Sequence, residues 1–140
     1  QDIIVVGALK GCIYFLSDLT RLIKNNLSIE FVNINSYRGT QRGDITFDSK
    51  LDFSIKDKSI LIIEDIVDTG NTVNFLFNKL NEKKPKEIKI VSFLFKPTVY
   101  KFNIDIDWVG FEIDNEFVVG YGLDYDGKFR NKNSIFKSKL

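Results

Sequence analysis

The sequence of 140 residues contains no histidine and no methionine, one cysteine (Cys12) and two prolines. The lack of histidine excludes histidine-rich metal sites and leaves carboxylates or lysines as general bases. A single cysteine excludes an internal disulfide and fits a reducing compartment. Because no signal peptide, transit segment or apolar run of membrane-spanning length is seen, we expect a cytoplasmic protein with no membrane partner.

Net charge is also almost absent, because 20 basic and 19 acidic residues give a formal charge of +1. This balance provides no electrostatic basis for nucleic acid as a partner. The apolar fraction of 44% is ordinary for a globular protein. We therefore expect residues 1–140 to form a single domain with a substantial core. The chain starts without methionine and almost directly in a strand, so we expect that N-terminal residues are missing before Gln1.

Strand-like and helix-like segments alternate along the chain. The patterns predict two helices, at 12–24 and 72–82. They predict strands and one short extended piece at 3–8, 29–34, 59–64, 88–95, 108–113 and 117–121. Residues 36–57 are polar and irregular, which is typical of a loop that moves or binds. This order predicts an α/β fold with a parallel twisted sheet flanked by helices, and a ligand beyond the carboxyl ends of its strands.

The segment from Ile60 to Thr72, ILIIEDIVDTGNT, carries the strongest functional pattern. An apolar run meets two carboxylates, Glu64 and Asp65, and the chain then reads Asp68-Thr69-Gly70-Asn71-Thr72 before a helix. Glycine permits a tight turn, and the hydroxyls and unpaired amides of a helix start suit a phosphate. Carboxylates suit sugar hydroxyls or a divalent cation. The pattern therefore predicts a site for a phosphorylated ribose with Mg²⁺.

This segment resembles the phosphoribosyl-diphosphate-binding motif of the type I phosphoribosyltransferases: an apolar run, two acidic residues, two variable ones and D-[ST]-G-x-[ST]. Further segments resemble the hypoxanthine-guanine phosphoribosyltransferases, at 5–11, 36–37, 96–97, 109–113, 117–125 and Arg130. The resemblance implies the type I phosphoribosyltransferase fold with a small hood, which missing N-terminal residues would truncate. It also implies purine salvage, in which the 5-phosphoribosyl group passes from phosphoribosyl diphosphate to hypoxanthine or guanine, giving IMP or GMP and diphosphate.

The resemblance implies roles for the acidic residues. Asp68 would be the general base that accepts a proton from the purine, whereas the structural alternative is a cap for the following helix. Glu64 and Asp65 would hold the ribose hydroxyls and Mg²⁺, and Asp124 would help to place a second Mg²⁺. The implied 5′-phosphate ligands are Thr69, Gly70, Asn71 and Thr72.

The resemblance likewise implies ligands for the diphosphate. Lys10 and Gly11 would bind this leaving group beside a cis peptide bond between Leu9 and Lys10, and Arg130 would meet it as well. The alternatives are a surface lysine and an exposed tail charge. Ser36 and Tyr37 would begin the flexible catalytic loop.

For the purine, the resemblance implies that Lys96 donates to the six-position oxygen, which selects hypoxanthine or guanine over adenine. Phe117 would stack on the base and Val118 would contact its edge through the main chain. A generic strand-end lysine is the alternative for Lys96.

Two other functions stay open at this point. Some relatives on this fold are non-enzymatic regulators that sense nucleotides and bind RNA, but such a protein should show a basic face. Another enzyme of the family could prefer xanthine or a pyrimidine as acceptor. Family members usually form homodimers or homotetramers, and the resemblance implies the same here.

Overall fold

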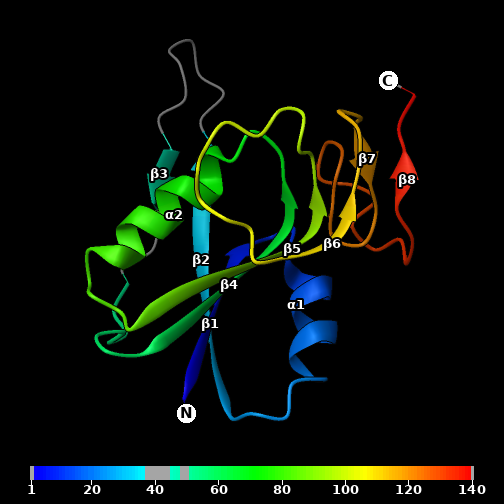
Figure 1. The fold of residues 1–140 in the computed structure, drawn as a ribbon. Coiled ribbons are helices and arrows are strands. Elements are labelled where there is room, and N and C mark those ends of the chain that lie inside the picture. Colours follow the sequence, from blue (N-terminus) through cyan, green and yellow to red (C-terminus); the bar gives the residue numbers. More distant parts are fainter. Residues whose placement is uncertain (1, 37–44, 48–50, 140) are drawn as a thin grey trace.

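The computed structural model describes residues 2–36, 45–47 and 51–139. In this part of the chain a main sheet has one helix on each face, and a short two-stranded ladder lies beside it (Figure 1). The main strands are β1 (Ile3–Leu9), β2 (Leu27–Ser36), β3 (Ile45–Phe47), β4 (Ser59–Val67), β5 (Glu87–Phe95) and β6 (Trp108–Glu112). The helices and the ladder are α1 (Ile13–Thr20), α2 (Asn71–Asn81), β7 (Val118–Val119) and β8 (Phe136–Lys137).

The main sheet has the strand order β3-β2-β1-β4-β5-β6. The neighbours from β2 to β6 are all parallel, which confirms the predicted parallel sheet. The exception is β3, which pairs antiparallel with the end of β2. The prediction of an irregular segment at 36–57 was therefore wrong in part. Pairing with β3 satisfies backbone groups of β2 that an edge strand would leave open.

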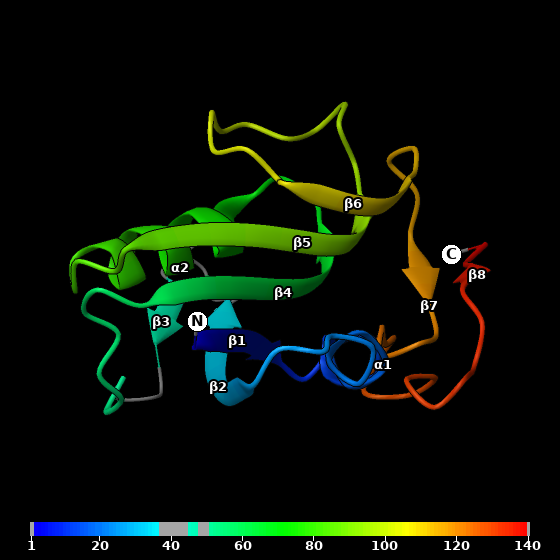
Figure 2. The same ribbon diagram turned by 60° about the horizontal axis from the view of Figure 1, so that its bottom comes forward.

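The two faces of the sheet carry separate cores because side chains alternate along each strand. On one face Ile4 and Val6 of β1 pack with the buried residues Leu76 and Leu80 of α2. On the other face Val5 packs with Cys12 and Leu16 at α1. Figure 2 shows the two helices on opposite sides of the strands. Neither helix reaches the length and apolar content that a membrane crossing requires, within the described residues.

Some predicted boundaries were wrong. Helix α1 ends at Thr20, whose hydroxyl donates to the Leu16 carbonyl over 2.7 Å. Leu22, which had extended the predicted helix, lies beyond this end with 79% of its surface exposed. Strand β4 continues through both carboxylates to Val67, because Ile66 and Val67 still pair with β5. The acidic pair therefore lies inside the strand and shares its rigidity.

The parallel strands β1, β4 and β5 all end at the same edge of the sheet, at the top of Figure 1. The ladder of β7 and β8 stands next to that edge. The segments between these elements surround the pocket described below.

Candidate active site

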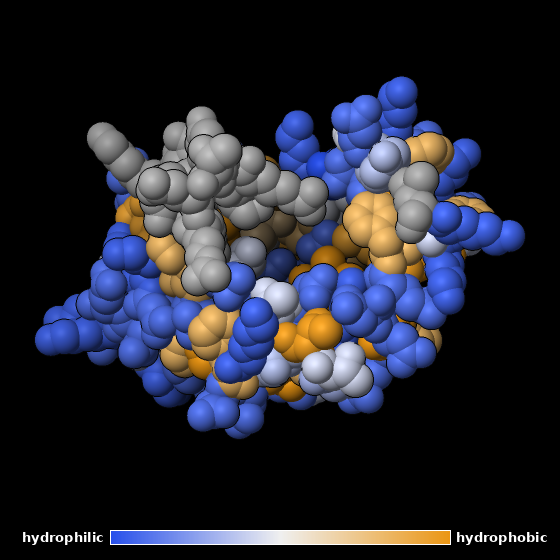
Figure 3. Space-filling view, turned by 90° about the horizontal axis from the view of Figure 1, so that it is seen from above, coloured by the Kyte–Doolittle hydropathy of each residue, from blue (hydrophilic) through white to orange (hydrophobic). Residues whose placement is uncertain are grey.

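A pocket of about 660 Å³ opens at the carboxyl edge of the sheet. Figure 3 looks onto this edge and shows a hollow whose rim mixes hydrophilic and hydrophobic residues. The predicted site residues that line the pocket are Lys10, Gly11, Glu64, Asp65, Asp68, Thr69, Gly70, Asn71, Thr72, Lys96, Phe117, Val118, Asp124 and Arg130. Ser36 ends β2, but its side chain lies outside what the structure describes, and Tyr37 lies outside the described residues.

Glu64 and Asp65 form an acidic pair on the pocket floor. Glu64 is 4% exposed, and its Oε1 atom has no hydrogen-bond partner among the described residues. Burial, followed by the nearby charge of Asp65, raises the pKa of Glu64 well above its usual range. Burial also raises the pKa of Asp65 to about 6, although backbone amides and Arg130 oppose this shift. A cation, or a hydroxyl group that donates a hydrogen bond, would stabilise the charged form of both carboxyl groups and so lower their pKa values.

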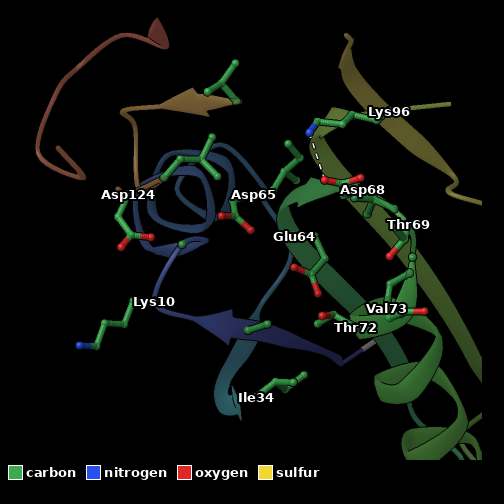
Figure 4. A pocket seen from close by; sticks show the side chains of 18 of the residues that line it. Lys10, Ile34, Glu64, Asp65, Asp68, Thr69, Thr72, Val73, Lys96 and Asp124 are labelled. Atoms are coloured by element: carbon green, nitrogen blue, oxygen red, sulfur yellow. Dashed lines mark hydrogen bonds and ion pairs between the residues drawn. The ribbon is translucent and has the colours of Figure 1, made fainter. Parts of the chain in front are cut away.

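Gly11 lies directly against Asp65 of this pair. A Cβ atom at Gly11 would stand 1.9 Å from Oδ2 of Asp65, so only glycine fits here without moving the carboxylate. The peptide bond between Leu9 and Lys10 is cis, as predicted. The Lys10 side chain is exposed and extends away from the two acids in Figure 4, in keeping with the surface-lysine alternative.

The donor set of the pair fits Mg²⁺ in its chemistry, because this ion prefers carboxylate oxygens and keeps several waters or substrate oxygens. Within the described residues no three acidic, cysteine or histidine side chains form a ready metal site. Asp124 already accepts bonds from the Gly127 amide over 2.8 Å and from Arg130 over 3.2 Å. Glu64 and Asp65 are therefore the residues that would hold the ion, and the remaining ligands would come from the substrate and water.

The start of α2 forms a cradle for an anion. Gly70 is the N-cap residue with φ +90°, and no side chain caps the helix. The alternative role for Asp68, as the N-cap of this helix, is therefore contradicted. The first turn carries no acidic side chain, so its unpaired amides remain available to a phosphate. Tyr100 and Phe102 pack against Gly70 and fix the turn.

Lys96 and Asp68 meet across the ends of β5 and β4. The Nζ atom of Lys96 lies 3.0 Å from Oδ2 of Asp68. A dashed line marks this contact in Figure 4. Lys96 is 6% exposed, and its backbone amide donates to the Val67 carbonyl. It is therefore a buried, paired cation at the end of its strand, and its role toward a purine stays a prediction.

The remaining wall comes from the segment around β7. Phe117 is half exposed and meets the edge of the Tyr125 ring at 5.9 Å. Arg130 donates to the Gly122 carbonyl over 2.7 Å and also pairs with Asp124. The interpretation of Arg130 as a free tail charge is thus excluded.

The sequence did not indicate every polar residue of the lining. Glu116 lies in the pocket and pairs with Lys137 of β8 over 2.5 Å. Its local context is a lone acid before an aromatic residue, which carries no pattern that could have identified it. The apolar lining residue Ile34 was also missed, because an isolated apolar residue at the end of a strand predicts core before ligand contact.

Comparison with known proteins agrees with this geometry. Residues 1–126 match the model of the phosphoribosyl transferase domain. The chain is 41% identical to a hypoxanthine phosphoribosyltransferase of Haemophilus influenzae, over 100% of this chain and 79% of that protein. It is 42% identical to a hypoxanthine-guanine phosphoribosyltransferase of Bacillus subtilis, over 91% of this chain and 72% of that protein.

Solved structures show the same likeness. A crystal structure of a hypoxanthine phosphoribosyltransferase from Staphylococcus aureus has a TM-score of 0.93 and 40% identity, covering 99% of this chain and 77% of that one. A Trypanosoma cruzi hypoxanthine phosphoribosyltransferase in complex with the product IMP has a TM-score of 0.90 and 33% identity, covering 98% and 75%. The chain therefore belongs to the phosphoribosyltransferase family, among the hypoxanthine-guanine phosphoribosyltransferases.

Proposed function

We propose that this protein transfers the 5-phosphoribosyl group of phosphoribosyl diphosphate to hypoxanthine or guanine, giving IMP or GMP and diphosphate in purine salvage. The observation that carries the proposal is the shared pocket. An acid pair, an anion cradle and the pair formed by the buried Lys96 and the half-exposed Asp68 surround one cavity. These groups match, in turn, the sugar, the phosphate and the base of one nucleotide.

The donor side of the pocket would bind phosphoribosyl diphosphate. Glu64 and Asp65 accept hydrogen bonds from the ribose hydroxyls. The amides of residues 69–72 bind the 5′-phosphate, with the Thr69 and Thr72 hydroxyls beside them. The backbone at Lys10 and Gly11 binds the diphosphate, with Arg130 facing it. The acid pair would also hold Mg²⁺, whose charge offsets the negative charge that develops on the diphosphate.

The acceptor side would bind a 6-oxopurine. Lys96 donates to the six-position oxygen, and Asp68 accepts a proton from the adjacent ring nitrogen. As that proton leaves, the opposite ring nitrogen bonds to the anomeric carbon of the ribose. The carbon–oxygen bond to the diphosphate breaks, and the diphosphate departs with the electron pair. Asp68 therefore acts as the general base.

The base would lie against the β7 segment. Phe117 stacks on the purine ring, and Val118 contacts its edge through main-chain groups. These main-chain contacts would read the two-position, which distinguishes hypoxanthine, guanine and xanthine. Asp124 would approach a second Mg²⁺ only by releasing part of its contact with Arg130 or Gly127, and this role stays a prediction.

Other features of the proposed enzyme also stay predictions. Closure of the loop that starts at Ser36 and Tyr37 would exclude water from the donor. The free, buried thiol of Cys12 is consistent with the predicted reducing environment of the cytoplasm. A homodimer or homotetramer is expected from the family, and light scattering of the purified protein tests it.

Diphosphate release tests the proposed function directly. The purified protein is mixed with phosphoribosyl diphosphate and hypoxanthine, guanine, xanthine or adenine, each with and without Mg²⁺. We expect Mg²⁺-dependent release with hypoxanthine and guanine and none with adenine. If diphosphate is released with xanthine and with no other purine, the proposed acceptor is wrong and xanthine replaces it. No release with any purine would contradict the function.

A further inference from the structure

The pocket wall at residues 117–124 is joined to the rest of the molecule in an unusual way. Its strand β7 pairs with β8, and this ladder is separate from the main sheet in the described residues. Figure 2 shows the ladder to one side of the strands, beyond α1. Contacts other than the hydrogen bonds of the main sheet therefore hold this wall against the body of the domain.

Tyr121 provides such a link. Its hydroxyl donates to Oδ2 of Asp18 on α1 over 2.5 Å, although the two residues are 103 positions apart. Its ring stacks on Tyr14 of α1 at 6.3 Å and meets Phe93 of β5 edge-on at 5.0 Å. Burial and the bond to Asp18 raise the pKa of Tyr121 to about 12, so the hydroxyl keeps the proton that it donates. One side chain thus connects the wall to both a helix and a strand.

The backbone around Tyr121 is specialised for this contact. Its φ of +48° lies between φ values of +100° at Gly120 and +98° at Gly122. A residue with a Cβ atom disfavours this left-handed region, so the surrounding contacts must hold it there. The amides of Tyr121 and Gly122 donate to the carbonyls of Lys132 and Arg130. The turn therefore directs the Tyr121 ring to α1 and leaves Gly122 on the side of the pocket.

Gly122 connects this anchor to the diphosphate side of the pocket. A Cβ atom at Gly122 would lie 2.0 Å from the carbonyl oxygen of Gly11, which itself packs against Asp65. Arg130 donates to the Gly122 carbonyl and pairs with Asp124. The purine side has its own attachment to the main sheet, because the backbone amide of Ile113, shortly before Phe117, donates to the carbonyl of Phe95 in β5. The backbone amide of Ser138 in turn donates to the Phe117 carbonyl beside the β7–β8 ladder.

We propose that Tyr121, held by Asp18, is a positioning residue for the diphosphate side of the pocket. It fixes Gly122 against Gly11 and thereby aligns Arg130 with the Lys10–Gly11 backbone. The proposal rests on the proposed function for the identity of the ligand. Because the base side has its own attachment, loss of the Tyr121 hydroxyl weakens diphosphate and donor binding more than purine binding.

Calorimetric titration with magnesium diphosphate, together with Michaelis constants for donor and hypoxanthine, tests this. For Tyr121→Phe and Asp18→Ala we expect diphosphate affinity to fall, and the donor KM to rise, by about tenfold. The hypoxanthine KM should stay within about twofold of wild type. Asp18→Asn keeps an oxygen acceptor and should restore most of the affinity. Tyr14→Phe removes a hydroxyl from the same aromatic cluster and serves as the matched control.

The proposal is overturned if Tyr121→Phe binds diphosphate as wild type does, if Tyr14→Phe weakens it equally, or if donor and hypoxanthine constants rise together. Thermal unfolding shows whether each variant is folded. Should Tyr121→Phe not fold, the comparison of Asp18→Ala with Asp18→Asn replaces it, because Asp18 is exposed and tolerates substitution. A wild type that binds diphosphate without turnover contradicts the proposed function and leaves the role of Tyr121 measurable. A wild type that does not bind diphosphate contradicts both.

Discussion

The ammonium group of Lys96 lies 3.0 Å from Asp68, yet the two side chains differ sharply in exposure, at 7% and 49%. The lysine is fixed in the protein, whereas the aspartate can turn toward a ligand. A buried ammonium without a partner is costly, so Asp68 can turn away only when another acceptor replaces it. The six-position oxygen of a purine is such an acceptor. In the proposed mechanism, binding of the base would therefore be coupled to release of the Asp68 carboxylate from Lys96.

Replacing Asp68 with asparagine tests the general base. The amide cannot take the purine proton, so we expect kcat to fall by roughly 10²–10⁴-fold. Asp57→Asn is the matched control, because Asp57 precedes β4 at the opposite edge of the sheet and its φ of +61° suits asparagine. Steady-state diphosphate release measures both variants. Turnover of Asp68→Asn within a few-fold of wild type would show that another group takes the proton.

Lys96→Met tests whether Lys96 selects a purine with an oxygen at the six-position. Methionine has a similar length but no donor, so the hypoxanthine KM should rise by roughly tenfold or more, and the preference over adenine should shrink. The exposed Lys101 provides the control Lys101→Met. Competition between hypoxanthine and adenine measures the preference. An unchanged preference would remove Lys96 from base selection.

Gly11→Ala tests the close approach of the first loop to the acid pair. The added Cβ would meet the Asp65 carboxylate at 1.9 Å, so this side chain must move. We expect kcat/KM for the donor to fall by roughly tenfold or more, since small misplacements at a reacting centre are expensive. Gly127→Asn is the control, because nothing lies within 4 Å of a Cβ there and asparagine tolerates its φ of +72°. Equal activity of the two variants would contradict the expectation.

The acid pair gives the free protein a distinctive pH dependence. The pKa of Asp65 rises from 3.8 to about 6 on folding, so between these values the folded chain binds more protons than the unfolded chain. Its contribution to the free energy of unfolding therefore falls as pH rises through this window, by about 2 kcal/mol after allowance for partial exposure. Glu64 shifts in the same direction.

Thermal unfolding of wild type and Asp65→Asn at about pH 5 and about pH 7.5 measures this contribution. Without Mg²⁺, Asp65→Asn should gain stability relative to wild type as pH rises. Added Mg²⁺ should stabilise wild type more at the higher pH, because it binds the charged carboxylates. If the difference in unfolding free energy between wild type and Asp65→Asn does not change with pH, Asp65 is not the group that takes up a proton in this range.

Local patterns in the sequence were sufficient to predict the parallel strands of the main sheet, both helices and most residues that line the pocket. The predicted strand at 59–64 and the residues 64–72 were identifiable because an apolar run, carboxylates and a glycine turn follow one another in the chain. The parallel order then brought Lys10, Lys96 and these residues to one edge, as alternation of strands and helices predicts.

Contacts between distant segments could not be predicted. The bond from Tyr121 to Asp18 spans 103 positions, and neither residue has a local pattern that indicates the other. Ile55 is 1% exposed although its neighbours are polar, because it packs into the core beside α2. Strand β3 was missed since three residues are too few for a periodic pattern.

Because the β7–β8 ladder is separate from the main sheet, the two parts of the binding site can change independently during evolution. Insertions or replacements in this ladder leave the hydrogen bonds of the main sheet intact. The nucleobase preference can therefore diverge among descendants of one ancestor, while the grip on the sugar phosphate is inherited unchanged with the sheet.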